Sequence, residues 1–375
     1  MAKTKTLFSF ELESGMIVAE DVYRSNGTLL FPKHTMLNDL MIAKLPLYNI
    51  MELPIVDGPL EPEVDVSAII EQAKAKAAAG HEQPKTSYVE KLKSSEDFKE
   101  FTKKYDETVG TINKSMEAFV NGEAPLEPEQ LVDDTLSLIS KGSSIRVFDM
   151  LQTMKSENDS LFARSTNTAL ISATIGRWLG LSQKEINDLT LAGLLHDLGM
   201  TKMPKEIIDK PGKLTDEEFE TIKTHPRLGY DLVRDYNLDT KVKEAILLHH
   251  ERCDGSGYPF GVSGNKITMY AKIVMVADVY DAITSKRSYR DMMSPFQAIE
   301  VFEKEGLHRY DPRVIMTFLE NIGAAYVNNF VRLTDGRVGE VIMLNKNCLS
   351  RPVVRVEDDF IDLTQHPELS IEEIV

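Results

Sequence analysis

The chain has 375 residues, of which 42% are hydrophobic and 27% are charged, and its formal net charge is −16. This length allows one large domain with smaller ones beside it. The acidic surface excludes broad binding to polymeric nucleic acid or anionic membranes, so an anionic substrate requires a local cluster of Lys and Arg.

Cysteine content and hydropathy indicate a reducing compartment. Cys253 and Cys348 are the two cysteines of the sequence, which excludes a disulfide framework or a zinc ribbon. No stretch of 18 or more uncharged apolar residues occurs, so we expect no membrane insertion. Residues 1–10 lack the apolar segment of a signal peptide, so we expect a cytoplasmic protein.

The first part of the chain, residues 1–60, is predicted to be a β-rich accessory segment. Asn26 and Gly27 separate two short apolar stretches, a pattern typical of a β-hairpin. Residues 61–145 are interpreted as a linker and helical region. They begin with a mixture of Pro, Ala, Lys and Glu and continue with a charged helical pattern.

The central region, residues 146–325, is predicted to be an all-helical core. Three helix starts have the spacing of a capping box, and they are Ser182 with Glu185, Thr215 with Glu218, and Ser294 with Gln297. Pro295 stands at a first helical position. Residues 269–284 are apolar on nearly every side, which predicts a buried helix.

Residues 326–375 return to a β pattern and are predicted to form a small β-rich segment. Asp335 and Gly336 lie between two apolar stretches and give a second hairpin signal. The whole chain is therefore expected to be mainly α-helical, with small β-rich segments at both ends.

Histidine and aspartate are concentrated in the helical core. The residues in question are His196, Asp197, His225, His249, His250 and Asp278. Imidazoles and carboxylates bind divalent Fe, Mn, Zn or Ni, and such metals lower the pKa of bound water and so supply hydroxide at neutral pH. A carboxylate at Asp197 is placed to bridge two metals, an arrangement suited to phosphoester displacement.

Each of these residues also has an ordinary structural explanation. His249 and His250 could end a helix and interact with its dipole. Asp197 could cap a helix, and Asp278 could pair with a buried arginine. We favour a metal site because all of these coincidences would have to occur together.

Four motifs in this core resemble the HD-GYP family. They are Leu-Leu-His-Asp-Leu-Gly at 194–199, Thr-His-Pro at 224–226, His-His-Glu-Arg-Cys-Asp-Gly-Ser-Gly-Tyr-Pro at 249–259 and Val-Ala-Asp-Val-Tyr-Asp-Ala at 276–282. The resemblance covers about half of the chain. It implies an HD-domain helical core that hydrolyses cyclic di-GMP to linear pGpG or to GMP.

The resemblance also implies roles for individual residues. It assigns one metal to His196, Asp197 and Asp278 with an upstream histidine, and a second metal to Asp197, His225, His249 and His250. It implies that Gly257, Tyr258 and Pro259 shape the substrate pocket, and that Arg287 and Arg290 contact phosphate or guanine. The expected catalytic residue is Asp197.

The sequence departs from the family at one ligand position. Arg164 stands where the upstream histidine is expected, and arginine stays protonated and does not bind metals. We expect its guanidinium either to pair with Asp278, which the sequence favours, or to turn to solvent. The first arrangement would leave about one metal per chain and the second would allow two.

The sequence therefore predicts a metal-dependent cyclic di-GMP phosphodiesterase whose activity is reduced by Arg164. One alternative is a degenerate module that binds cyclic di-GMP or a signalling protein without hydrolysis. A further alternative is an HD hydrolase that acts on another phosphoester. Protein partners and a homodimer are left open.

Overall fold

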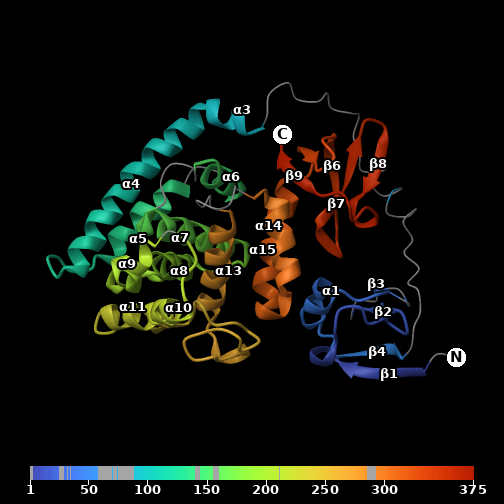
Figure 1. The fold of residues 1–375 in the computed structure, drawn as a ribbon, viewed down its shortest axis with the longest axis horizontal. Helices are drawn as coiled ribbons and strands as arrows, with labels where there is room; N and C mark the ends of the chain where they lie inside the picture. Colours follow the sequence, from blue (N-terminus) through green and yellow to red (C-terminus); the bar gives the residue numbers. More distant parts are fainter. Residues whose placement is uncertain are drawn as a thin grey trace. The chain divides into compact units, whose positions relative to one another are not determined.

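The structure is a computed structural model in which residues 3–24, 29–31, 33, 35–57, 70, 74, 88–139, 144–154, 160–210, 212–284 and 293–375 are described. The chain divides into two compact units. The first comprises residues 1–87, 293–308 and 319–375, and the second comprises residues 88–292 and 309–318. Figure 1 shows that the second unit is helical, whereas strands occur at both ends of the chain.

The N-terminal part of the first unit contains two small antiparallel sheets and a short helix. Strand β1 (Lys3–Phe8) pairs with β4 (Glu52–Asp57), and β2 (Val22–Tyr23) pairs with β3 (Leu29–Phe31). The predicted hairpin is therefore present as a strand pair, while its turn at Asn26 and Gly27 lies outside the described residues. Helix α1 (Asp39–Lys44) begins at Asn38, whose side chain accepts from the Met41 N–H.

The C-terminal part of the first unit is an antiparallel sheet in the order β8-β7-β6-β5-β9. Its strands are β5 (Phe330–Leu333), β6 (Val338–Asn345), β7 (Cys348–Val356), β8 (Asp359–Asp362) and β9 (Ile371–Ile374). The predicted turn at Asp335 and Gly336 joins β5 to β6, and Gly336 adopts φ +86° there. Helix α14 (Pro295–Glu305) packs on β7.

The second unit is built from helices. Before the site they are α3 (Tyr88–Ser94), α4 (Glu96–Val120), α5 (Pro128–Leu136), α6 (Ser144–Met154), α7 (Leu161–Trp178) and α8 (Gln183–Leu195). Around the site they are η4 (Leu198–Lys202), α9 (Lys205–Ile208), α10 (Asp216–Ile222), α11 (His225–Val233), α12 (Thr240–Leu248) and α13 (Met269–Thr284). The first turns of α15 (Pro312–Ala325) also belong to this unit.

Helices α7, α8 and α13 pack together and form the interior of the second unit. The apolar run at 269–284 is α13, and most of its residues are buried, as predicted. A Cβ built on Gly193 of α8 would lie 2.6 Å from the Cα of Ala169 in α7, so a side chain there would separate the two helices. This close packing fixes the end of α8, where His196 and Asp197 follow.

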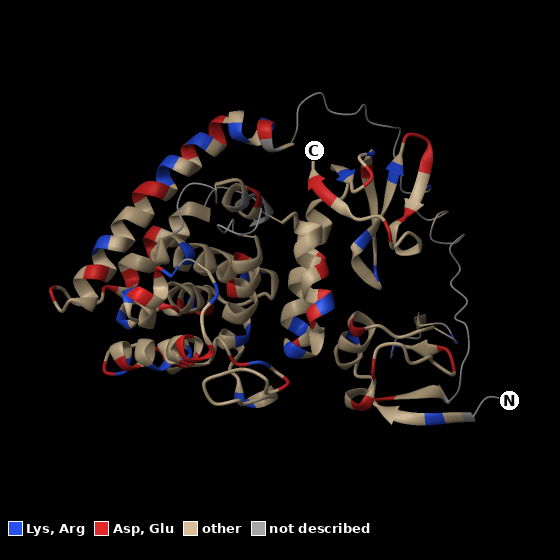
Figure 2. Ribbon diagram, viewed as in Figure 1, with Lys and Arg blue, Asp and Glu red and all other residues tan. Residues whose placement is uncertain are grey.

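The predicted fold class and the predicted helix starts are confirmed. Capping boxes begin α8 at Ser182, α10 at Thr215 and α14 at Ser294, and Pro295 occupies the first turn of α14. Figure 2 shows Lys and Arg alternating with Asp and Glu along α4, as expected for a solvated helix face. Within the described residues, no helix is long and apolar enough to cross a membrane.

Candidate metal centre

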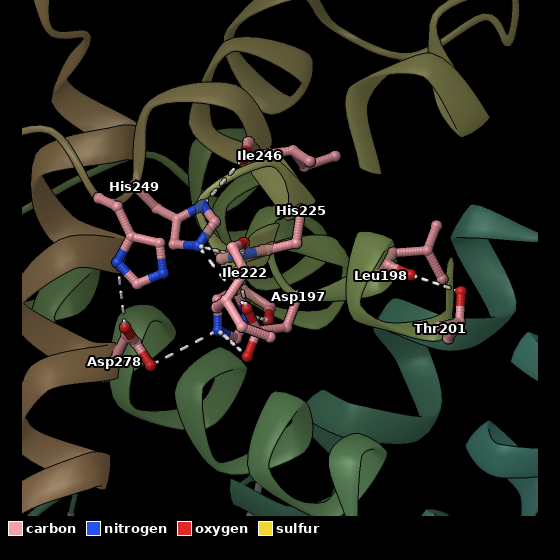
Figure 3. A network of polar contacts seen from close by, with 11 residues as sticks. Asp197, Leu198, Thr201, Ile222, His225, Ile246, His249 and Asp278 are labelled. Carbon is pink, nitrogen blue, oxygen red and sulfur yellow. Dashed lines mark hydrogen bonds and ion pairs between the residues drawn. The ribbon is translucent and has the colours of Figure 1, made fainter. Parts of the chain in front are cut away.

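The predicted histidines and aspartates converge from separate elements of the second unit. Asp197 begins η4 and His225 begins α11, His249 follows the end of α12, and Asp278 lies within α13. Figure 3 shows these four side chains turned toward one another. They form two overlapping groups whose ligand atoms lie within 4.8 Å of one another, namely Asp197 with His225, His249 and His250, and Asp197 with His196 and Asp278.

The backbone fixes the orientation of three imidazoles in the same way. Nδ1 lies 2.8 Å from the carbonyl oxygen of the residue three positions earlier in His196, His225 and His249. A carbonyl oxygen only accepts hydrogen bonds, so each Nδ1 carries the proton. In the neutral ring the other nitrogen, Nε2, then presents a lone pair to the centre of the cluster, which is the form of histidine that binds metals.

Asp197 divides its two carboxylate oxygens between the two groups. Oδ1 lies 3.1 Å from His225 Nε2 and 3.7 Å from His249 Nε2. Oδ2 lies 3.4 Å from His196 Nε2. Asp197 is thus the residue that the two groups share.

Asp278 completes the geometry on the α13 side. Its Oδ1 lies 3.6 Å from His196 Nε2, and its Oδ2 lies 3.9 Å from His250 Nδ1. The Asp278 side chain is 13% exposed, so this carboxylate is nearly withdrawn from water. A cation in the cluster would offset the cost of that burial.

The cluster contains nitrogens that the protein itself does not satisfy. Among the described residues, His196 Nε2 is buried without a hydrogen-bond partner in bonding geometry. Nε2 of His225 faces Nε2 of His249 at 3.3 Å, although both rings carry their protons on Nδ1. Two lone pairs at this distance repel each other, so the donor set fits a divalent cation better than it fits the protein alone.

Burial and charge set the protonation states that a metal requires. Burial lowers the pKa of His249, and burial together with His249 lowers the pKa of His250 further, so both rings are neutral at pH 7. Burial opposes ionisation of Asp197 and Asp278, but the neighbouring histidines prevail and hold the pKa of both carboxyls below its usual range. His196 differs, because burial is outweighed there by Asp197 and Asp278, which raise its pKa to about 9, so a metal at this group would have to displace the proton on Nε2.

The Gly-Tyr-Pro loop lies directly against the cluster. The Tyr258 ring stacks on His250, with 4.6 Å between ring centroids and 29° between planes. A Cβ on Gly257 would lie 2.4 Å from the His250 carbonyl oxygen, so only glycine allows this approach. Pro259 follows Tyr258, while Arg287 and Arg290 lie outside the described residues.

Glu251 is a site residue to which the sequence assigned no role. Its side chain is fully buried, and its carboxylate accepts the N–H of Phe260 at 2.7 Å and of Val262 at 3.0 Å. Because Glu251 directly follows His250, it ties the loop after Pro259 to the histidine pair. The sequence feature that could have indicated this role is the position of Glu251, directly after two histidines and before a Gly-rich segment.

Arg164 is half-buried in the first turn of α7. The Asp278 carboxylate lies 3.6 Å from His196 Nε2 and 3.9 Å from His250 Nδ1. The pairing of Arg164 with Asp278 stays a prediction.

Residues 149–314 match the family model described as HD domain. This match includes the helices that carry the histidine–aspartate cluster, so this part of the chain is similar to an HD domain. The motifs at 194–199, 224–226, 249–259 and 276–282 carry the resemblance to the HD-GYP family, and curated relatives of the chain are named cyclic di-GMP phosphodiesterases.

Two curated relatives illustrate the similarity. The cyclic di-GMP phosphodiesterase PA4108 of Pseudomonas aeruginosa is 36% identical over 204 residues, which cover 54% of this chain and 49% of the relative. The response regulator RpfG of Xanthomonas campestris, also named a cyclic di-GMP phosphodiesterase, is 39% identical over 151 residues, which cover 40% of each chain. The chain thus spans about half or less of the length of these relatives.

A solved structure supports the fold. Bd1817, an HD-GYP-type protein from Bdellovibrio bacteriovorus, matches with a TM-score of 0.50 and 16% identity, covering 85% of this chain and 99% of that one. At this identity the likeness concerns the fold alone.

Proposed function

We propose that this chain is a metal-dependent phosphodiesterase that hydrolyses cyclic di-GMP to linear pGpG or to GMP. The names of the relatives supply the substrate class, and the HD domain supplies the reaction class. The observation that carries the proposal is the Asp197 carboxylate, whose two oxygens face two separate groups of imidazole and carboxylate ligands.

The donor set suits one or two ions of Fe, Mn, Zn or Ni. The first group offers His196, Asp197 and Asp278, and the second offers Asp197, His225, His249 and His250. When bound, such ions supply hydroxide at neutral pH and stabilise charge on phosphoryl oxygens. Asp197 serves both groups and is the residue to which we assign the central catalytic role.

The protein residues around the ligands position them and the substrate. The carbonyls of Gly193, Ile222 and Ile246 hold three rings with Nε2 facing inward. Glu251 holds the loop that carries Tyr258, and Tyr258 covers His250. We assign Gly257, Tyr258 and Pro259 to the wall of the substrate pocket, and Arg287 and Arg290 to its phosphate contacts.

Catalysis is favoured over binding without hydrolysis because the cluster is otherwise intact. Loss of one ligand at position 164 leaves four donors in the second group and three in the first. A module that only binds nucleotide would not need neutral imidazoles directed at a shared carboxylate. A cytoplasmic location, signalling-protein partners and a homodimer remain predictions.

The test is elemental analysis and a hydrolysis assay on the same sample of the full chain. We expect at least one transition-metal ion per chain and conversion of cyclic di-GMP to pGpG or GMP, separated by chromatography. His225→Ala should lose most of the metal and the activity, because it removes a buried ligand of the second group. His366→Ala, an exposed histidine paired with Glu368, is the matched control.

A metal-free protein that nonetheless hydrolyses cyclic di-GMP would contradict the assigned chemistry. A metal-loaded protein that binds cyclic di-GMP without converting it would favour the binding module instead.

A further inference from the structure

Beside the metal cluster, α10 carries one exposed aromatic ring on an acidic surface. Phe219 is 45% exposed, and Asp216, Glu217 and Glu218 precede it in the same helix. Figure 2 shows acidic residues on this helix. A single exposed phenyl ring is ordinary by itself, so its meaning depends on what surrounds it.

A series of ring contacts connects Phe219 to the metal-ligand histidines. The Tyr258 ring stacks on His250 and lies 6.5 Å from the His225 ring. Tyr258 also meets Phe219, with 6.4 Å between ring centroids and an interplanar angle of 79°. Phe219 therefore contacts the histidines through Tyr258. The Phe219 and Tyr258 rings are nearly perpendicular, so a flat base can stack on one ring while its edge meets the other.

A cation accompanies these two rings. Lys223 Nζ lies 4.9 Å from the Phe219 ring centroid and 5.9 Å from the Tyr258 ring centroid. The same Nζ lies 2.5 Å from Glu220, whose side chain is 68% exposed. The Lys223 side chain is 29% exposed, so the pair is partly exposed, and a phosphate group can replace the more exposed Glu220 carboxylate at modest cost.

We propose that Phe219 and Lys223, together with Tyr258, form a purine-nucleotide subsite at the edge of the metal cluster. Phe219 stacks on the base, and Lys223 neutralises a phosphate of the same nucleotide. The proposal rests on the proposed function, which brings a nucleotide to this cluster. It adds residues of α10 and its C-terminal end to a pocket otherwise assigned to the Gly-Tyr-Pro loop and to Arg287 and Arg290.

The competing explanation is mechanical, because Phe219 could merely support Tyr258 by packing. The two explanations differ in the effect that they predict on the binding of inorganic phosphate, a ligand without a base. A stacking residue affects ligands that carry a purine and leaves inorganic phosphate unaffected. A supporting residue disturbs His250 through Tyr258 and weakens both ligands.

Titration calorimetry of 5′-GMP and inorganic phosphate on the metal-loaded full chain separates these explanations. Phe219→Leu keeps apolar volume but removes the ring, and we expect the Kd of GMP to rise about tenfold, as for loss of one stacked base. The Kd of phosphate should stay within about twofold. Phe219→Trp should restore GMP binding, and Phe10→Leu, at an 80% exposed ring of the first unit, should change neither value.

Lys223 is tested with the same calorimetry. Lys223→Met should weaken GMP binding several-fold and reduce its salt dependence, while guanosine, which lacks phosphate, should bind as before. Glu220→Gln frees Lys223 and should leave GMP binding as tight or tighter. Unchanged GMP binding in Phe219→Leu, or equal weakening of GMP and phosphate, would overturn the subsite.

The outcome is independent of catalysis. If the unmodified chain fails to hydrolyse cyclic di-GMP but Phe219→Leu still weakens GMP selectively, the proposed function fails and the subsite stands. If hydrolysis occurs with the same KM in the unmodified chain and in Phe219→Leu, the function stands and the subsite fails. A selective rise in KM with little change in kcat supports both.

Discussion

The C-terminal sheet and the helical unit both bury ionisable side chains, but they satisfy them differently. In the sheet, Glu340 is 3% exposed and pairs with Arg355 on the adjacent strand. Glu303 of α14 accepts the Leu349 N–H at 2.8 Å and the Ser350 hydroxyl. These carboxylates find their partners within the protein.

In the helical unit, the buried histidines use Nδ1 for the backbone and direct Nε2 at one another and at carboxylates. Within the described part of the chain, His196 Nε2 has no hydrogen-bond partner, and Nε2 of His225 faces Nε2 of His249 at 3.3 Å. The comparison shows how a structural ionisable group differs from a functional one. The first completes its bonding internally, whereas the second needs something that the chain does not provide.

The largest effect is expected at the residue that joins the two ligand groups. Asp197→Asn keeps the size of the side chain but removes the shared charge, so it should lower the hydrolysis rate by about a thousandfold or more and reduce metal content. Steady-state kinetics and elemental analysis measure the two effects. Asp188→Asn on α8, where the carboxylate pairs with Lys184, is the control. Near-normal turnover in Asp197→Asn would remove Asp197 from the centre.

A substitution in the C-terminal sheet should have the opposite result, because it should lower the free energy of unfolding and leave the metal content unchanged. Arg355→Met leaves the buried Glu340 carboxylate without its guanidinium partner, so the sheet should lose about 3–5 kcal/mol of stability. Arg332→Met breaks an exposed pair with Glu373 and should cost less than about 1 kcal/mol. Denaturant unfolding measures both. Loss of metal from Arg355→Met under native conditions would mean that the ion pair in the sheet also affects the histidine–aspartate cluster.

Features set by local sequence were predictable. The capping boxes at Ser182, Thr215 and Ser294 depend on residues three positions apart, and the turn at Gly336 depends on two adjacent residues. The convergence of the histidines followed from motifs whose order and spacing are specific.

Features that depend on the path of a loop or on a choice of rotamer were not predictable. Glu251 binds N–H groups nine and eleven residues later, and these reach it only because of the way the loop folds back. Phe219 meets Tyr258 from a helix that precedes it by about forty residues.

A smaller effect is expected at Arg164, and it sharpens the contrast between the two ligand groups. Arg164→His supplies an imidazole at the position where the resemblance predicts a ligand, so metal content should rise toward two ions per chain. Activity should increase about tenfold, the lower range for completing a metal site. Arg164→Gln removes the charge without supplying a ligand and controls for simple relief of repulsion. Two tightly bound ions and full turnover in the unmodified chain would show that position 164 does not limit the site.

The smallest expected effect is the contribution of Glu303 to the pH dependence of stability. Burial raises the pKa of Glu303 above its ordinary value of 4.5, although the hydrogen bonds from Ser350 and Leu349 oppose the shift. The folded state therefore holds this proton more tightly than the unfolded state does. Its contribution to stability is complete below pH 4.5 and is lost as the pH rises through the folded-state pKa.

Glu303→Gln should remove this dependence because the amide does not titrate. Its carbonyl oxygen can still accept the Leu349 N–H, and its amino group can donate to the Ser350 hydroxyl, so the fold should persist. Urea unfolding at a series of pH values measures the free energy of unfolding of both proteins. As the pH rises above 4.5, the stability of the variant should increase relative to that of the unmodified chain. Glu372→Gln, at an exposed position of β9, should follow the unmodified chain throughout. A stability difference that is constant with pH would mean that the pKa of Glu303 is the same in the folded and unfolded states. The contrast between the sheet and the histidine cluster would then depend on the Glu340–Arg355 pair alone.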